Sequence, residues 1–221
     1  MKRKRQSEKK NRFITASRIL YYKLLTTIIF KYTIVFYIVM LEKYALVKAI
    51  RVLTSDPMKS FSVRGLAREA GLSPGAARTA LDYMREKGIA SLRIIGKTYQ
   101  YRADLESPLC RQWKILFNLD KISESGIVEQ AIKKIPQTLS ILLYGSFAKG
   151  TNDKKSDIDL LVVSRQKPKI DFSFTNKLGK ETNISQFSLA DWKKKAVENK
   201  VFYENAIYDS IALFGEKPVV T

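Results

Sequence analysis

The chain has 221 residues, enough for one large domain or two small ones that each bury a core. Its 40 Lys or Arg against 21 Asp or Glu give a formal net charge of +19, which favours an anionic partner such as nucleic acid, nucleotide phosphate or a membrane surface. One cysteine and no histidine exclude disulfide scaffolds, Cys/His zinc sites and a histidine base. Any catalysis must use carboxylates, lysines or hydroxyls, and a reducing, cytoplasmic compartment is expected.

The first 39 residues differ in composition from the rest. Residues 1–18 hold eight basic side chains and one acid, and residues 19–41 form an apolar run that Lys23 and Lys31 interrupt. The run is long enough to span a bilayer, although each lysine near its centre costs about 2.5–3.5 kcal/mol. Three interpretations are open for residues 1–39: a mis-assigned start before a native Met40, a membrane anchor, or a helix packed on the protein. A membrane is a partner only if the run is genuine.

Residues 41–104 carry the pattern of a helix, a helix-turn-helix and a β-hairpin. Apolar residues spaced near the 3.6-residue period predict the first helix. In the third helix, Ser73 suits the N-cap, Pro74 the first helical position and Gly88 the left-handed residue past its end. The alternating segments ASLRII and KTYQYR then predict a hairpin.

This stretch resembles the small winged helices of archaeal and bacterial transcription regulators, and LAREAGLSPGAARTALDYMREKGI carries the resemblance. The resemblance implies that residues 73–87 lie in the major groove of DNA while the hairpin contacts the backbone. Twelve basic against six acidic residues in this stretch favour phosphate contact. The base-facing candidates are Arg78 and Thr79, and the phosphate candidates are Arg64, Arg68, Lys97 and Arg102. The alternative is a module for protein docking or dimerisation.

After a helical connector predicted at residues 105–135, a buried strand ends at Gly145-Ser146, and ten residues later Asp157 and Asp159 open another apolar run. Side chains two apart in a strand share a face, so these two carboxylates point together. They repel each other unless a divalent cation lies between them. Glycine lets the backbone approach a phosphate closely, and Ser146 adds a hydroxyl and an amide donor. The alternative is a pair of solvated aspartates beside a helix-capping serine.

The segment GSFAKGTNDKKSDIDLLVV resembles the signature of the DNA polymerase beta nucleotidyltransferase superfamily, and especially its minimal archaeal and bacterial members. The resemblance covers residues 136–221 and implies an α+β chain, in which a small mixed-sheet α/β domain follows the winged helix-turn-helix. It implies metal-dependent transfer of a nucleoside monophosphate from a nucleoside triphosphate, expected to be ATP, to a hydroxyl. The site residues that it implies are Asp157 and Asp159 for two Mg²⁺ ions, Gly145 and Ser146 for the triphosphate, and Lys149 for the charge developing on it.

Members of this superfamily usually carry a third acid on a following strand. Here Asn183 occupies the expected position in the segment KETNISQFS, after a helix that Asp171 is expected to cap, and Glu181 on the same face is the candidate substitute. Two functions therefore stay open. One is an active transferase whose acceptor is a nucleic acid or a protein, such as a small helical toxin by analogy with antitoxins of this size. The other is a DNA-binding regulator that senses nucleotide through a weak or inactive transferase fold.

Overall fold

The computed structural model describes residues 44–166 and 179–220, and all the elements below belong to the compact unit Ala45–Thr221. The extension at residues 1–39, its apolar run and the expected cap Asp171 lie outside the described residues. Within the described ranges, no helix has the length and apolar character needed to cross a membrane.

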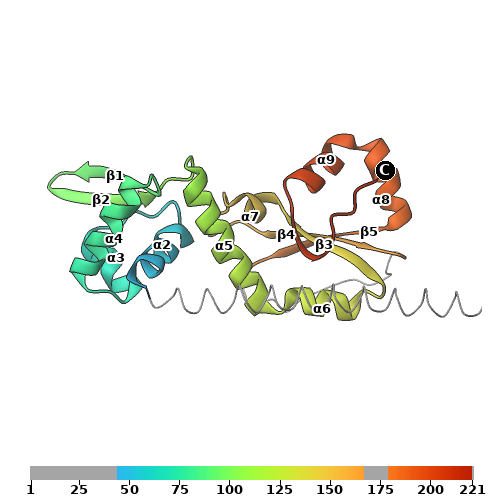
Figure 1. Cartoon of the computed structure of the whole chain (residues 1–221), viewed down its shortest axis with the longest axis horizontal. Coiled ribbons are helices and arrows are strands. Elements are labelled where there is room, and N and C mark those ends of the chain that lie inside the picture. Colours follow the sequence, from blue (N-terminus) through green and yellow to red (C-terminus); the bar gives the residue numbers. More distant parts are fainter. Residues whose placement is uncertain (1–43, 167–178, 221) are drawn as a thin grey trace, which may run out of the picture. The chain divides into compact units, whose positions relative to one another are not determined.

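The described chain begins with three helices and a hairpin. These are α2 (Ala45–Ser55), α3 (Val63–Ala70), α4 (Pro74–Glu86), β1 (Ala90–Ile95) and β2 (Thr98–Ala103), with the two strands antiparallel (Figure 1). The end signals of α4 are confirmed, because the Ser73 hydroxyl accepts a hydrogen bond from the Ala76 amide and Gly88 has a φ of +69°. Leu53 of α2 and Leu81 and Met84 of α4 are fully buried, and these two helices contact each other.

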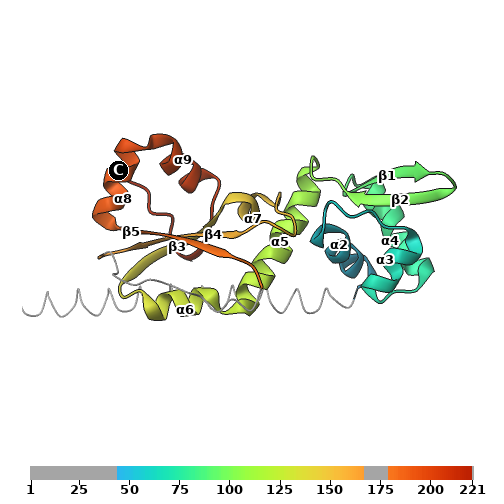
Figure 2. The same ribbon diagram turned by 180° about the vertical axis from the view of Figure 1, so that it is seen from behind.

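One long helix, α5 (Pro108–Ser125), follows the hairpin and lies within residues 105–135, where the sequence predicts a helical connector. It ends at the left-handed Gly126, after which α6 (Ile127–Lys134) begins. Helix α5 contacts α2, and it also contacts the short helix α7 (Gly145–Lys149), as both ribbon views allow the reader to follow (Figures 1 and 2).

The second half of the described chain is built on a four-stranded mixed sheet of order β5-β4-β3-β6. Its strands are β3 (Thr138–Tyr144), β4 (Ile158–Ser164), β5 (Thr182–Ser188) and β6 (Ile211–Gly215). Strand β3 is antiparallel to β4 and β6, whereas β4 and β5 are parallel. Two further helices, α8 (Leu189–Glu198) and α9 (Lys200–Tyr208), lie between β5 and β6 in the chain.

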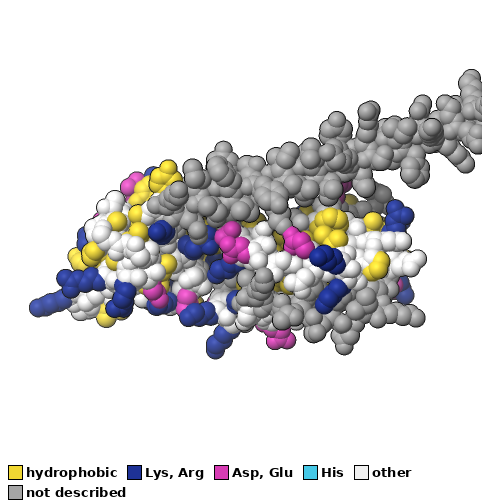
Figure 3. Space-filling view, turned by 90° about the horizontal axis from the view of Figure 1, so that it is seen from below, with side chains coloured by type: hydrophobic (Ala, Val, Ile, Leu, Met, Phe, Trp, Pro, Cys, Tyr) yellow, Lys and Arg dark blue, Asp and Glu magenta, His cyan; other side chains and the backbone are white. Residues whose placement is uncertain are grey.

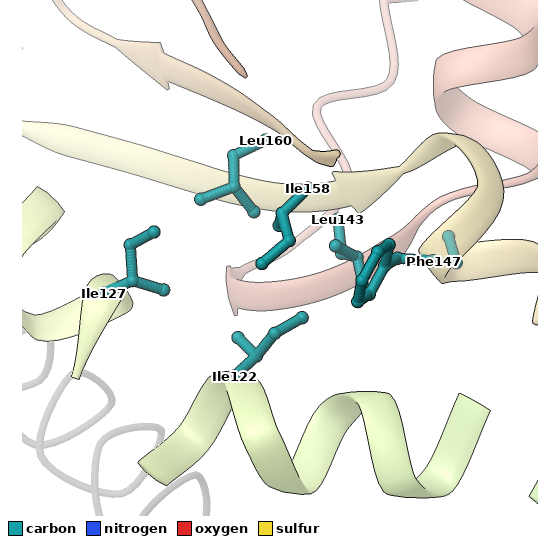
Figure 4. Close-up of a cluster of buried hydrophobic side chains, with 7 residues drawn as sticks. Ile122, Ile127, Leu143, Phe147, Ile158 and Leu160 are labelled. Carbon is teal, nitrogen blue, oxygen red and sulfur yellow. The ribbon is translucent and has the colours of Figure 1, made fainter. Parts of the chain in front are cut away.

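Alternation along β4 separates the two faces of the sheet. Ile158 and Leu160 pack against Ile122 of α5 and Ile127 of α6 (Figure 4). Leu161 and Val163 point the other way and pack with Trp192 of α8 and with α9. Asp159 has the same parity as Leu161, so its side chain leaves the sheet on the face that α8 and α9 cover.

Candidate active site

Asp159 lies between two neighbours in the sheet. It pairs with Tyr144, the last residue of β3, and with Asn183 of β5. The Asn183 side-chain amide donates a hydrogen bond to Asp159 Oδ1 at 3.2 Å. The residue at the expected position of a third acid therefore contacts the second aspartate directly, as an amide donor where a carboxylate would repel it.

Gly145 closes the other side of Asp159. Its φ is +70°, in the left-handed region, and a Cβ atom placed there would collide with the Asp159 carboxylate. The Gly-Ser turn and the Asp-x-Asp segment, separated by ten residues in sequence, are thus in direct contact. The left-handed backbone favours glycine at this place, and any larger residue would displace the Asp159 carboxylate.

Asp157 and Glu181 stand one step before this pair. Asp157 is half-buried and directly precedes β4, and the Ile158 amide donates to the Glu181 carbonyl at 2.9 Å. The register places Asp157 beside Glu181 as it places Asp159 beside Asn183. Both pairs share one face by alternation, and the Glu181 side chain is exposed. The pairing thus sets Asp157 and Glu181 directly before the neighbouring strands β4 and β5, with Asp159 two residues further along in β4.

Ser146 and Lys149 lie on α7, directly after Gly145. Ser146 is half-buried, and its carbonyl accepts a hydrogen bond from the Thr151 amide at 3.0 Å. The Lys149 ammonium forms an ion pair with Asp209 at 2.8 Å, with the two side chains 50% and 42% exposed. Such an exposed pair is weak and can exchange for another anion. Asp209, which ends α9, carried no signal in the sequence.

The turn that leads into Asp157 is held from within and from outside. Asp153 Oδ1 accepts hydrogen bonds from the Ser156 hydroxyl at 2.9 Å and from the Lys155 and Ser156 amides at 2.8 and 2.9 Å. The hydroxyl of Ser156 and these amides lower the pKa of Asp153. From outside, the Lys180 ammonium donates to three carbonyls of the same turn. Sequence reasoning missed both residues.

A buried pair of asparagines ties the same loop to α5. Asn118 on α5 donates to the Phe147 carbonyl at 3.0 Å and to Asn152 Oδ1 at 2.8 Å, and Asn152 donates back at 3.4 Å. Both side chains are only 4% exposed. Gly150 approaches the Arg111 carbonyl so closely that a Cβ would overlap it. Helix α5 therefore packs directly against residues 147–152, which connect the Gly-Ser turn to the Asp-x-Asp segment.

Helix α5 also holds two buried groups with shifted pKa values, at some distance in sequence from the carboxylates. Burial lowers the pKa of Lys114 to about 8, and its ammonium donates to the Thr54 carbonyl of α2 at 2.7 Å. Burial raises the pKa of Cys110 to about 11. The thiol therefore stays protonated at neutral pH, whereas a reactive cysteine needs the thiolate, so Cys110 is a packing residue as expected.

The donor set suits a hard cation. Across residues 44–166 and 179–220 there is no group of three or more His, Cys, Asp or Glu side chains placed to hold a metal. Magnesium needs fewer, because it is commonly held by one or two carboxylates together with substrate phosphates and water. Asp157 and Asp159 are the two carboxylates that could do so, and Gly145 lies directly against the second of them.

The side chains predicted to bind DNA lie mostly on the surface of the N-terminal region. Arg64, Arg68, Arg78, Thr79 and Lys97 are all exposed. Figure 3 shows Lys and Arg side chains projecting at the end of the molecule that carries the β1–β2 hairpin. Arg78 pairs with Asp82 at 3.0 Å, and the Thr79 hydroxyl donates to the Gly75 carbonyl at 3.2 Å. Arg102 differs, because its Nε donates to the Pro57 carbonyl at 2.7 Å and so ties the hairpin to the turn after α2.

Two comparisons with known proteins found a match. Residues 126–207 match the family model of the nucleotidyltransferase domain. The chain is also similar to one chain of a crystal structure of a toxin-antitoxin with AMP-PNP, at 19% identity and a TM-score of 0.31, over 45% of this chain and 75% of that one. No curated protein matches the chain.

Proposed function

We propose that the chain is a metal-dependent nucleotidyltransferase that moves a nucleoside monophosphate from a nucleoside triphosphate, ATP first among them, to a hydroxyl of a protein or a nucleic acid. The observation that carries the proposal is the contact of Gly145 with the Asp159 carboxylate inside the region that matches the nucleotidyltransferase domain. In the transfer, the acceptor oxygen bonds to the α-phosphorus, the bond from that phosphorus to the bridging oxygen breaks, and pyrophosphate leaves while the acceptor gives up its proton.

Each candidate residue has a stated part in this reaction. Asp157 and Asp159 would hold Mg²⁺, and bound magnesium would neutralise phosphate charge and orient the attacking and leaving oxygens. The Gly145 backbone and Ser146 would bind the triphosphate, and Lys149 would leave Asp209 to neutralise its charge. Glu181 is the candidate to accept the proton of the acceptor, since Asn183 has no basic group.

The test is magnesium-dependent ATP binding by the full chain, measured by calorimetry. The Asp157→Asn, Asp159→Asn double variant should lose binding. The control is Glu198→Gln, Glu204→Gln, which also removes two negative charges, one from α8 and one from α9, and should bind ATP as the unmodified protein does. ATP labelled at its α-phosphate, followed by protease or nuclease treatment of the product, then separates a protein acceptor, such as a small helical toxin, from a nucleic acid. Unchanged ATP binding by the Asp157→Asn, Asp159→Asn variant would contradict the proposed site.

A second candidate function follows from the Asn183 contact. An amide bonded to Asp159 favours nucleotide binding without efficient transfer, which would suit a regulator that senses nucleotide. The two candidates differ in product: pyrophosphate and a labelled acceptor, or a nucleotide-dependent change in DNA affinity alone. Asn183→Asp should increase pyrophosphate release if the amide is what limits catalysis, and should leave it unchanged if Glu181 already serves.

We also propose that α2–α4 and the β1–β2 hairpin form a DNA-binding winged helix-turn-helix. The proposal is supported by their order and by exposed basic side chains on α3, α4 and the hairpin. DNA affinity should fall steeply with salt, because each phosphate contact releases counterions. Binding that does not change with salt, or no binding at all, would favour a docking module.

A further inference from the structure

Lys180 makes a concentrated set of contacts beside the candidate site. Its ammonium lies 3.3 Å from the Asp153 carbonyl, 2.8 Å from the Lys154 carbonyl and 2.9 Å from the Ser156 carbonyl. It also lies 5.4 Å from the ring centroid of Phe147, on α7. An ammonium has three donors, so the three carbonyls can take all of them.

These contacts supply donors to backbone carbonyls of the turn at residues 153–156. Asp153 gathers the amides of Lys155 and Ser156 on one side, which leaves carbonyls of the same turn directed away from it. The bonds to the Asp153 and Ser156 carbonyls are partly buried, where a carbonyl needs a donor, and the bond to the Lys154 carbonyl is exposed. The ammonium supplies one positive donor to three dipoles that converge, an arrangement that neither a neutral side chain nor a water molecule reproduces as well.

The turn ends one residue before Asp157, so its closure fixes the backbone from which that carboxylate projects. The contact with Phe147 links the same ammonium to α7, which begins at Gly145. One side chain that belongs to neither half of the candidate site therefore contacts both the turn before the Asp-x-Asp segment and the helix that carries Ser146.

We propose that Lys180 is a positioning residue, which closes the turn at residues 153–156 and so holds Asp157 in place beside Asp159. Its effect on nucleotide rests on the proposed function, whereas its effect on the turn does not. Lys180 acts through the turn and does not contact substrate, because its donors are directed to carbonyls.

The experiment compares three variants of the full chain. Lys180→Met keeps the length of the side chain but removes its donors, and Lys180→Arg keeps a positive donor. Lys155→Met removes one positive charge from the exposed surface of the same turn and serves as the matched control. Hydrogen exchange of residues 153–158 reports on the turn, and calorimetry reports on ATP binding with magnesium and with EDTA.

Lys180→Met should speed exchange in residues 153–158 and weaken magnesium-dependent ATP binding by about tenfold, as loss of a supporting contact behind a metal ligand typically does. Lys180→Arg should recover part of both, and Lys155→Met should change neither. Equal losses for Lys180→Met and Lys155→Met would overturn the proposal in favour of a general charge effect. Exchange that rises evenly through β4 and β5 would overturn it in favour of overall destabilisation.

Failure of the proposed function is a separate outcome. If the unmodified protein binds no nucleotide with magnesium, the nucleotidyltransferase proposal falls, and exchange alone decides the role of Lys180. Faster exchange confined to residues 153–158 then supports the closure of the turn, and unchanged exchange overturns it.

Discussion

The N-terminal helices and the sheet region support their candidate residues in different ways. On α3, α4 and the hairpin, the side chains proposed to bind DNA are exposed, whereas other side chains, such as Leu66 and Leu81, form the core. Around Asp159, in contrast, the candidates are held by polar side chains distant in sequence: Asn183, Lys180 and Asn118. A surface built on a finished core tolerates change, whereas a site held by a polar network does not.

The largest expected effect of a single change is at Gly145. Gly145→Ala places a Cβ against the Asp159 carboxylate, so magnesium-dependent ATP affinity should fall about 100-fold. Gly126→Ala is the matched control, because Gly126 has a φ of +69° and no atom within 4 Å of its built Cβ. It should lose about 1 kcal/mol of stability from the left-handed backbone and keep its affinity. Equal affinity losses in both variants would show backbone strain, not the contact, to be responsible.

The buried asparagine pair should give the next largest effect. Asn118→Ala leaves the Asn152 side chain and the Phe147 carbonyl without their partner, which should lower the free energy of unfolding by about 2 kcal/mol. Denaturant titration measures it. In a double-mutant cycle, Asn118→Ala with Asn152→Ala should cost less than the sum of the single changes, by about 1 kcal/mol. Strict additivity would mean that the two amides do not stabilise each other.

Lys114 should make stability depend on pH. The folded protein releases the Lys114 proton near pH 8, whereas the unfolded chain keeps it to about the ordinary value of 10.5. Between these values the unfolded state binds more protons, so stability rises with pH, by about 1 kcal/mol from pH 8 to pH 9. Lys114→Met should reduce this rise, and any rise that remains is assigned to Lys121, whose pKa burial also lowers.

The pH window matters because Cys110 acts in the opposite direction. Its pKa is raised from 9.0 to about 11, so as the pH rises through 9 the unfolded chain loses that proton first and stability falls. Chemical denaturation from pH 7.5 to pH 9 limits the contribution of Cys110, and comparison with Lys114→Met separates Lys114 from Lys121. A rise of the same size in Lys114→Met would assign it to another group.

The smallest effect on stability should come from the surface of the N-terminal region. Arg64→Ala should change the free energy of unfolding by less than about 0.5 kcal/mol while reducing the salt slope of DNA binding by about 1. Arg102→Ala should also destabilise the fold, because it removes the hydrogen bond to the Pro57 carbonyl. Fluorescence anisotropy across a salt series and thermal melts separate the two. Equal melting temperatures of the two variants would contradict a structural role for Arg102 that Arg64 lacks.

Local signals were sufficient for much of the fold. Ser73 and Gly88 bound α4 as expected, because caps and left-handed glycines act within a few residues. Alternation placed Asp159 on the opposite face from Ile158, and the pattern placed Asn183 on the neighbouring strand. Each of these inferences needed only a periodicity of two or a turn.

The contacts that sequence reasoning missed join residues far apart in the chain. Asn118 meets Asn152 across 34 positions, and Lys180 meets the turn across 24 to 27. Neither type of residue has a periodic signal, and an asparagine inside a helix or a lysine before a strand is normally solvated. An Asn at an inward position of α5, between buried Lys114 and Ile122, was the one available signal.

Helix α5 sets a condition on how this protein can be divided. The match to the nucleotidyltransferase domain begins at residue 126, just after α5. The helix nevertheless carries Asn118, whose amide holds the loop before Asp157, and two residues later Asp120, which pairs with Arg51 of α2 at 2.8 Å. A fragment that begins at residue 126 would lack α5, so it would expose Ile158 and Leu160 and leave the Asn152 side chain without its partner. The smallest fragment that keeps these contacts starts at Pro108. Cutting there separates Asp120 from Arg51 of α2.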